Sequence, residues 1–409
     1  MYLQVSPVSR LALLCLFAIV PARSAPADTT AAVWVGTWAT APFGGDPWHQ
    51  VPTLVDSTLR QIVHTSIAGQ ALRVRLTNEF GSEALRIDAA TVALSAGESA
   101  IQPDSLHLLT FGGQPSIVVP AGAQVMSDSV NLSTPAFADL SISMYLPLQQ
   151  ISNVSAHSSA QQTNYIQTGN QTTAPRFSAP VTMPSWYFLK GVDVQPAAPR
   201  AAAVVALGDS ITDGAHASEN KNHRWPDYLA VRLHDNPATA NLAVLNEGIG
   251  GNCVLVSCVG PNALARFDRD VLAQSGVRYL IILESINDIG RLHDSNRPDY
   301  RLTAQDLEQG FLQLIARAHA RDIKVIAATV TPYQGAGYFT ERGEQIRQAL
   351  NSWILTSGAF DGTVDFDKAT RDPNRPTFFS SQADSGDHLH PKDDGYKAMV
   401  EAFDLNLFQ

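Results

Sequence analysis

The 409-residue chain contains little cysteine, little positive charge and few long apolar runs. Three cysteines without clustered His, Asp or Glu partners are too few for a metal site, so no metal is expected. The 28 Lys and Arg residues are outnumbered by 38 Asp and Glu residues, and there is no polybasic stretch. An acidic chain of this kind is a poor nucleic-acid binder. The sequence also lacks internal repeats and low-complexity tracts.

One apolar run stands out near the amino end. Arg10 precedes the apolar residues 11–20, and small residues follow as far as Ala25. This order of charged, apolar and small-residue zones is typical of a secretory signal. We therefore expect residues 1–24 to be a signal peptide, cleaved near Ser24, and the mature protein to be secreted or periplasmic without a membrane span. An uncleaved anchor is the alternative, but ten apolar residues are short for a bilayer.

Cleavage would leave two cysteines, Cys253 and Cys258. An even pair in an exported protein can form a disulfide, here closing a small loop. Two buried free thiols are the alternative.

The rhythm of apolar residues changes along the chain and predicts two domains. Residues 25–198 contain short alternating segments such as 72–76 and 140–144, separated by turn residues, which predicts an antiparallel β-sandwich resembling a jelly roll. Residues 196–199 are Pro- and Ala-rich and predict a linker. In residues 199–409, apolar strands such as 202–207 and 323–328 alternate with helical patterns, which predicts a parallel sheet covered on both faces.

Several aromatic residues lie in the β-rich region and allow three interpretations. They are Trp34, Trp38, Trp48, Trp186 and Tyr187. Such side chains could stack on a glycan, but aromatic residues more often belong to a core. The domain could also pack over one edge of the sheet predicted in residues 199–409 and shape a pocket there. His64 and His157 of this region are predicted to be ordinary polar surface residues.

A serine follows the buried strand predicted at 202–207. Residues 208–214 read Gly-Asp-Ser-Ile-Thr-Asp-Gly, so Ser210 lies in a tight turn at the carboxyl edge of the sheet. Sites of α/β folds collect at this edge. Ser210 is therefore a candidate nucleophile, and the alternative is a serine that caps a helix.

A serine nucleophile needs a base and a group that orients the base. Asp387 precedes His390 by three residues, and in a turn this spacing can bring the carboxylate onto one imidazole nitrogen while the other faces Ser210. His388 is the competing histidine, but directly beside Asp387 it would face away in an extended segment.

When a serine attacks a carbonyl group, the carbonyl oxygen becomes an oxyanion, which needs hydrogen-bond donors. Residues 246–252 form a glycine-rich turn after the strand predicted at 242–245, and residues 284–288 follow the strand predicted at 279–283. Gly251 offers an unhindered backbone N–H and Asn287 offers a side-chain amide. Each turn alone is weak evidence, but all these segments occur together.

With these motifs, residues 200–409 resemble the SGNH hydrolases, also called the GDSL esterase/lipase family. The resemblance implies a flavodoxin-like α/β/α fold, with Ser210 as nucleophile and the Asp387–His390 pair as its base. It also implies an oxyanion hole formed by the N–H groups of Ser210 and Gly251 and the amide of Asn287.

Two details refine the resemblance. Ser285 occupies a position where the family usually has glycine, and this departure bears on how the loop of Asn287 is placed. The stretch 260–270 resembles a secreted branch that includes arylesterases and carbohydrate acylesterases.

The sequence therefore predicts a secreted serine esterase that needs no cofactor. We expect it to remove short acyl groups, above all acetyl, from polysaccharides or oligosaccharides. The alternatives are a lipase or arylesterase of broad specificity and a non-catalytic glycan-binding protein. The sequence does not predict an oligomeric state.

Overall fold

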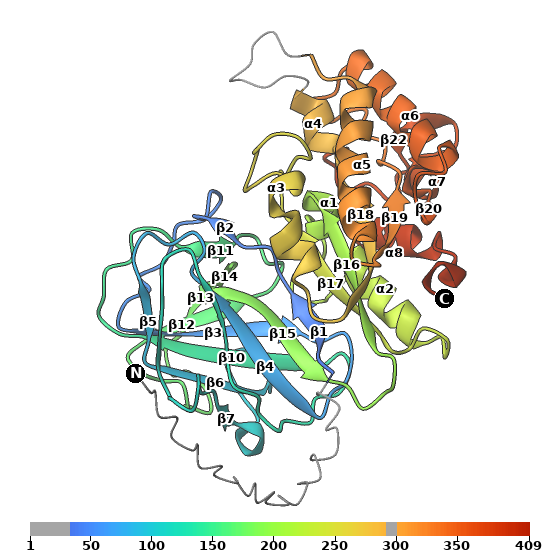
Figure 1. Cartoon of the computed structure of the whole chain (residues 1–409). Coiled ribbons are helices and arrows are strands. Elements are labelled where there is room, and N and C mark those ends of the chain that lie inside the picture. The colour runs from blue at the N-terminus through green and yellow to red at the C-terminus, as the bar shows by residue number, and fades with distance from the viewer. Residues whose placement is uncertain (1–32, 292–300) are drawn as a thin grey trace, which may run out of the picture. The chain divides into compact units, whose positions relative to one another are not determined.

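The computed structural model describes residues 33–291 and 301–409 (Figure 1). The predicted signal peptide and its cleavage site lie outside the described residues. Among the described residues, no helix is both long and apolar enough to cross a lipid bilayer.

The first half of the described chain forms antiparallel sheets, as the alternating pattern predicts. The main sheets have the strand orders β1-β15-β4-β9 and β13-β12-β3-β10-β6-β7, and smaller ones have the orders β14-β11-β2 and β5-β8. The strands are β1 Val35–Ala39, β2 Phe43–Gly44, β3 Ser57–His64, β4 Ala71–Thr77, β5 Leu85–Ile87, β6 Ala89–Leu94, β7 His107–Leu108, β8 Ile117–Val119, β9 Gln124–Met126, β10 Asp139–Leu146, β11 Ser155–His157, β12 Asn164–Thr168, β13 Val181–Met183, β14 Trp186–Tyr187 and β15 Leu189–Gln195.

The second half forms a five-stranded parallel sheet with the order β17-β16-β18-β19-β20. Its strands are β16 Ala202–Gly208, β17 Leu242–Gly248, β18 Val277–Leu283, β19 Lys324–Ala328 and β20 Gly362–Val364. Numbered along the chain, this order is 2-1-3-4-5, the flavodoxin-like order implied by the resemblance. The order in which strands are added to the sheet reverses between β16 and β18, and the crevice at such a switch point is the usual ligand site of open α/β sheets.

The longer helices of this half form two packed groups, one of α2, α7 and α8 and another of α3, α4, α5 and α6. Their bounds are α1 Ser210–Asp213, α2 Trp225–His234, α3 Ala263–Phe267, α4 Ile286–Arg291, α5 Ala304–His319, α6 Glu341–Thr356, α7 Phe366–Thr370 and α8 Asp393–Glu401; a hairpin of β21 Arg371–Asp372 and β22 Arg375–Phe379 lies between α7 and α8. Thr303 caps α5 by accepting from the Asp306 N–H, and the face of this helix that carries Leu307, Phe311 and Leu314 is buried.

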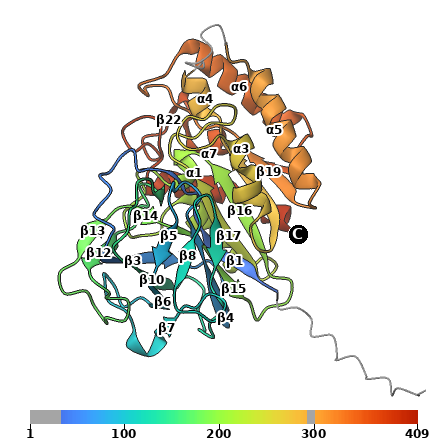
Figure 2. The same ribbon diagram turned by 60° about the vertical axis from the view of Figure 1, so that its left-hand side comes forward.

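The two sheet systems meet directly. Strand β15 ends at Gln195 and β16 begins at Ala202, so the predicted linker 196–199 lies between them. Strand β1 packs on β17, where a Cβ added to Gly36 would lie 2.8 Å from Cδ1 of Leu245. Residues Val33–Gln409 form one compact unit, seen from another side in Figure 2, and most of its core belongs to one hydrophobic cluster.

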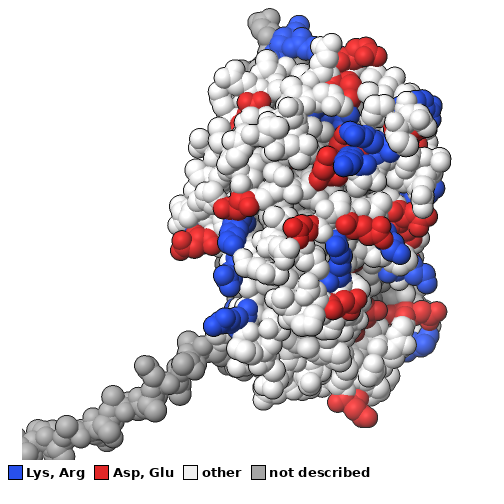
Figure 3. All heavy atoms as spheres, turned by 90° about the vertical axis from the view of Figure 1, so that its right-hand side faces the viewer, with Lys and Arg blue, Asp and Glu red and all other residues white. Residues whose placement is uncertain are grey.

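Most of the aromatic candidates belong to this core. Trp38, Trp186 and Tyr187 are buried, and Trp38 and Trp186 pack edge to face with ring centroids 5.0 Å apart. Trp48 differs, because 46% of its surface is exposed. On the face shown in Figure 3, acidic and basic side chains are interspersed over the surface.

Candidate active site

The turn after β16 places Ser210 at the carboxyl edge of the parallel sheet. A Cβ added to Gly208 would lie 2.0 Å from Oγ1 of Thr212 and 2.6 Å from the Leu283 carbonyl oxygen, so the turn requires glycine. Asp209 is the N-cap of α1 and accepts from the Ile211 N–H at 2.9 Å. Ser210 is the first residue of that helix, so the capping role belongs to Asp209 and the Ser210 hydroxyl is available for chemistry.

The hydroxyl of Ser210 is the first member of a hydrogen-bonded chain. Oγ of Ser210 lies 2.8 Å from Nε2 of His390, and Nδ1 of His390 lies 2.6 Å from Oδ2 of Asp387. A carboxylate only accepts, so Nδ1 carries a hydrogen and Nε2 can accept from the serine hydroxyl. The structure thus brings the three predicted residues together in the geometry of a Ser-His-Asp triad.

The turn around Asp387 keeps this carboxylate ionised. Its Oδ1 accepts from the backbone N–H groups of Leu389 and His390, both at 2.9 Å, and from the Ser385 hydroxyl at 3.0 Å. Partial burial opposes ionisation, but the hydrogen bonds from the side chain and backbone of His390 hold the pKa of Asp387 well below its usual range.

His388 lies in the same turn but serves a different carboxylate. Its Nδ1 lies 2.6 Å from Oδ2 of Asp384, and its side chain is half exposed. The prediction of an extended backbone here is wrong, because His388 has a φ of +61°. Two N–H groups of the turn, from Gly386 and His388, donate to Asp384 and hold this bend.

Two backbone donors predicted for the oxyanion have no other partner. Among the described residues, the N–H groups of Ser210 and Gly251 donate to no protein acceptor. Gly251 has a φ of +72°, which favours glycine. This turn is held against the loop that carries Ser210 because the Ile249 N–H donates to the Gly208 carbonyl at 3.0 Å.

The Asn287 amide reaches the same turn. Its Nδ2 donates to the Asn252 carbonyl oxygen at 2.9 Å, which leaves the second amide hydrogen for another acceptor. The neighbouring Asp288 accepts from the backbone N–H groups of Val254 and Leu255 at 2.8 and 3.1 Å. Burial raises the pKa of Asp288 to about 6.

The loop after Gly251 contains a disulfide between Cys253 and Cys258, with Cα atoms 5.8 Å apart. This bond and the two hydrogen bonds to Asp288 hold the loop that follows the glycine-rich turn of Gly250 and Gly251.

Ser285, which stands where the family usually has glycine, has a strained backbone. Its φ is +102°, and its hydroxyl is buried without a hydrogen-bond partner among the described residues. Only glycine adopts such a φ without strain. Asn287 nevertheless contacts the Asn252 carbonyl, so the departure appears as backbone strain at Ser285.

Arg266 supports the site and was not singled out by sequence reasoning. This fully buried guanidinium donates to the carbonyl oxygens of Gly208 at 2.8 Å and Glu247 at 2.6 Å, and to Oδ1 of Asn252 at 2.9 Å. It therefore joins the ends of β16 and β17 to Asn252, which follows the glycine-rich turn. The only sequence signal was its place in the stretch 260–270, which carried the narrower resemblance.

The prediction for His157 is wrong. The side chain is 3% exposed rather than on the surface, and its Nε2 lies 2.9 Å from Oδ1 of Asp213 in α1. Strand β11 directs it into the interface with the parallel-sheet region, which local sequence does not reveal. His64 is half-buried and pairs with Asp139 at 2.7 Å.

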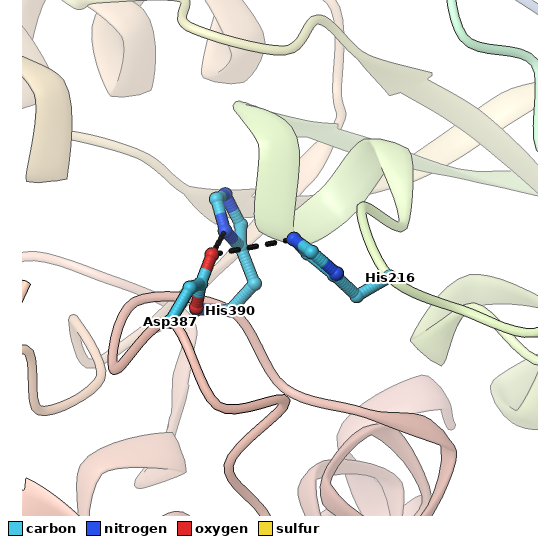
Figure 4. A group of neighbouring side chains, drawn as sticks. All are labelled: His216, Asp387 and His390. Atoms are coloured by element: carbon cyan, nitrogen blue, oxygen red, sulfur yellow. Dashed lines mark hydrogen bonds and ion pairs between the residues drawn. The ribbon is translucent and has the colours of Figure 1, made fainter.

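Figure 4 shows that a second histidine approaches the triad. Nε2 of His216 lies 3.3 Å from Oδ2 of Asp387, and potential ligand atoms of His216, Asp387 and His390 lie within 4.8 Å of one another. The same Oδ2 accepts from His390, so a cation bound here would compete with the triad.

Comparison with known proteins covers the second half of the chain. The model of the GDSL-like lipase/acylhydrolase family matches residues 206–398. No curated protein matches the sequence.

Solved structures are similar over about half of the chain. A GDSL-like lipase from Bacteroides thetaiotaomicron VPI-5482 is 20% identical, with 52% of this chain and 90% of that chain covered and a TM-score of 0.38. An aryl esterase from M. smegmatis is 18% identical, with 49% of this chain and 96% of that chain covered and a TM-score of 0.39. A variant of an acetyl xylan esterase from Geobacillus stearothermophilus is 21% identical, with 50% of this chain and 94% of that chain covered and a TM-score of 0.38.

Proposed function

Because residues 206–398 belong to the GDSL-like lipase/acylhydrolase family and the chain is therefore a carboxylic ester hydrolase, we propose that Ser210 is its nucleophile. The observation that carries this proposal is the hydrogen-bonded chain from Ser210 through His390 to Asp387. It begins at Ser210, at the edge of the sheet, and the backbone N–H groups of Ser210 and Gly251 donate to no acceptor among the residues that the structure describes.

The proposed reaction is acyl transfer in two steps. His390 Nε2 accepts the hydroxyl proton of Ser210 as Oγ attacks the ester carbonyl, and the oxyanion is bound by the N–H groups of Ser210 and Gly251 and by the Asn287 amide. His390 returns the proton to the departing alcohol oxygen. Water then attacks the acyl-enzyme with the same base, releasing the acid and restoring Ser210. The ionised Asp387 stabilises the imidazolium that forms in each step.

For the substrate we propose short acyl groups, above all acetyl, carried by polysaccharides or oligosaccharides. Trp48 supports a carbohydrate. This exposed side chain packs beside the oxyanion turn, where a Cβ added to Gly250 would lie 3.2 Å from Cη2 of Trp48. An aromatic face next to the reacting centre suits the apolar face of a sugar ring.

The loop that bears Trp48 is anchored. Oδ2 of Asp46 accepts from the hydroxyls of Ser185 at 2.6 Å and Tyr187 at 3.1 Å, while Oδ1 accepts from Ser158 and from the His49 N–H. These bonds hold the loop in place, so Trp48 is presented at little entropic cost.

The first experiment measures hydrolysis of p-nitrophenyl acetate, butyrate and octanoate and release of acetate from acetylated xylan, with Ser210→Ala as control. Ser210-dependent release from both acetyl substrates supports the proposal. A preference for octanoate favours the lipase alternative, and no Ser210-dependent turnover contradicts the catalytic assignment.

Trp48→Ala and Trp48→Phe refine the substrate assignment. We expect Trp48→Ala to raise KM on acetylated xylan and to leave p-nitrophenyl acetate hydrolysis nearly unchanged, with Trp48→Phe retaining most of the affinity for xylan. Equal effects on both substrates contradict a sugar-binding role.

We also propose that the protein is exported with cleavage near Ser24, supported by the order of zones in residues 1–25. Amino-terminal sequencing of the protein from the producing cells tests this. An intact Met1 contradicts it.

A further inference from the structure

One buried side chain of the antiparallel region is connected to the oxyanion turn through hydrogen bonds. The His157 ring lies between two acceptors: Nδ1 is 3.0 Å from the Ala41 carbonyl oxygen and Nε2 is 2.9 Å from Oδ1 of Asp213. Trp186 packs on the ring with centroids 5.6 Å apart. Because both neighbours accept, both ring nitrogens donate, and the ring is an imidazolium.

The electrostatic surroundings favour this charge. Burial lowers the pKa of His157, but the charge and hydrogen bond of Asp213, the Ala41 carbonyl and the more distant Glu247 together raise it above the ordinary value. His157 and Asp213 thus form a buried ion pair between the two regions.

Asp213 joins the nucleophile helix to the oxyanion turn. It is the last residue of α1, which begins at Ser210, and its Oδ2 accepts from the Gly250 N–H at 3.1 Å. A Cβ added to Gly248 would lie 2.2 Å from the Asp213 backbone nitrogen, so helix and strand end are in close contact. The next N–H along the chain is that of Gly251.

We propose that His157 is a positioning residue for the oxyanion hole, acting on the Gly250–Gly251 turn through Asp213. The inference rests on the proposed oxyanion role of Gly251. The imidazolium orients the carboxylate so that Oδ1 and Oδ2 have one partner each. Without His157, Asp213 turns toward other donors and the Gly250 N–H loses its acceptor. The hydrolase region therefore depends on the antiparallel region for the geometry of its own site.

Two replacements separate the hydrogen bond from the packing of the ring. His157→Asn keeps a donor near the position of Nδ1, toward Ala41, but is too short to reach Asp213. His157→Gln extends a donor toward Asp213. Both lose the aromatic ring. His64→Gln is the matched control, because it removes the contact of another β-region histidine with an aspartate, Asp139, that is not part of the site.

We expect His157→Asn to lower kcat on p-nitrophenyl acetate about 10- to 100-fold at unchanged KM, since small misplacements of catalytic groups cost up to about 100-fold. The affinity for phenylboronic acid, which forms a tetrahedral adduct with an activated serine, should fall in parallel. His157→Gln should retain most of the activity and His64→Gln nearly all of it.

Equal losses in His157→Asn and His157→Gln would assign the effect to packing and overturn the proposal. So would a normal kcat in His157→Asn, or a lower melting temperature with unchanged kcat and boronate affinity. Wild-type protein without Ser210-dependent turnover would overturn the proposed function as well, whereas active wild type with unaffected His157→Asn overturns this inference alone.

Discussion

The turn at residues 384–391 contains two aspartate–histidine pairs, Asp384–His388 and Asp387–His390, that are nearly alike within themselves. In each, Nδ1 lies 2.6 Å from a carboxylate oxygen, and the other carboxylate oxygen accepts two backbone N–H groups. They differ at Nε2, because only His390 has the Ser210 hydroxyl 2.8 Å away.

The local turn orients both imidazoles, but the tertiary structure decides which of them lies beside Ser210. Short side chains that accept backbone N–H groups form such pairs locally. The distant strand end that carries Ser210 then selects one of the two histidines.

The largest difference between the pairs should appear when the histidines are removed. We expect His390→Ala to lower kcat by at least about 10⁴-fold, because the serine loses its base. His388→Ala should retain nearly all activity. Initial rates on p-nitrophenyl acetate measure kcat for both variants. A comparable loss of kcat in His388→Ala would show that His388 also takes part in the reaction.

Amide substitution of the carboxylates should give the next largest effect. Asp387→Asn is expected to lower kcat about 10³- to 10⁴-fold, since the amide no longer holds the Nδ1 hydrogen or stabilises the imidazolium. Asp384→Asn is the matched control and should keep nearly full activity. A mild Asp387→Asn phenotype would mean that another group orients His390.

Lowering the pH should also show the contribution of the ionised Asp387 carboxylate to stability. A carboxyl group with a depressed folded pKa contributes stability above its unfolded pKa of about 4, which is lost as the pH falls through the folded value. We expect wild type to lose stability relative to Asp387→Asn as the pH falls below about 4, measured by urea unfolding. Parallel pH profiles of the two proteins would contradict this.

The surroundings of the Asp384–His388 pair can be disturbed without contacting Ser210, Asp387 or His390. A Cβ on Gly335, whose φ is +104°, would lie 2.8 Å from the ring of His388. Gly335→Ala should therefore lower the free energy of unfolding by about 1 to 3 kcal/mol while kcat stays nearly unchanged. Thermal unfolding and initial rates test this, and a large loss of kcat in the folded variant would implicate His388 in the reaction.

The smallest expected effect concerns His216, the second imidazole that contacts Asp387. Among the described residues, Asp384 contacts only one imidazole, that of His388. His216→Ala removes the contact of Nε2 with Oδ2 at 3.3 Å. Because both groups are partly exposed to water, we expect only about a twofold to fivefold loss of kcat. Inhibition by added Zn²⁺ should weaken in the variant, and unchanged inhibition would place the ion elsewhere.

The strands of the parallel sheet and the contact between Asp387 and His390 were predictable from sequence because local patterns encode them, whereas the order of the strands was implied only by the family resemblance. The apolar residues 202–207 and 323–328 predicted strands, and β16 and β19 confirm them. The pairing of Asp387 with His390 follows from a spacing of three residues in a turn. Arg266 and His157 could not be found in this way, since the partners of Arg266 come from separate strand ends and Asp213, the partner of His157, lies in helix α1.

By itself, the sequence predicted the strands of the parallel-sheet region, a resemblance to one hydrolase family and a set of candidate site residues, because strand periodicity and turn motifs act over a few residues. Only the tertiary structure decided which histidine faces Ser210, that His157 is buried rather than exposed, and that Trp48 lies beside Gly250. These outcomes depend on contacts between sheets far apart in the chain, where burial removes water and gives a hydrogen bond or an ion pair its effect.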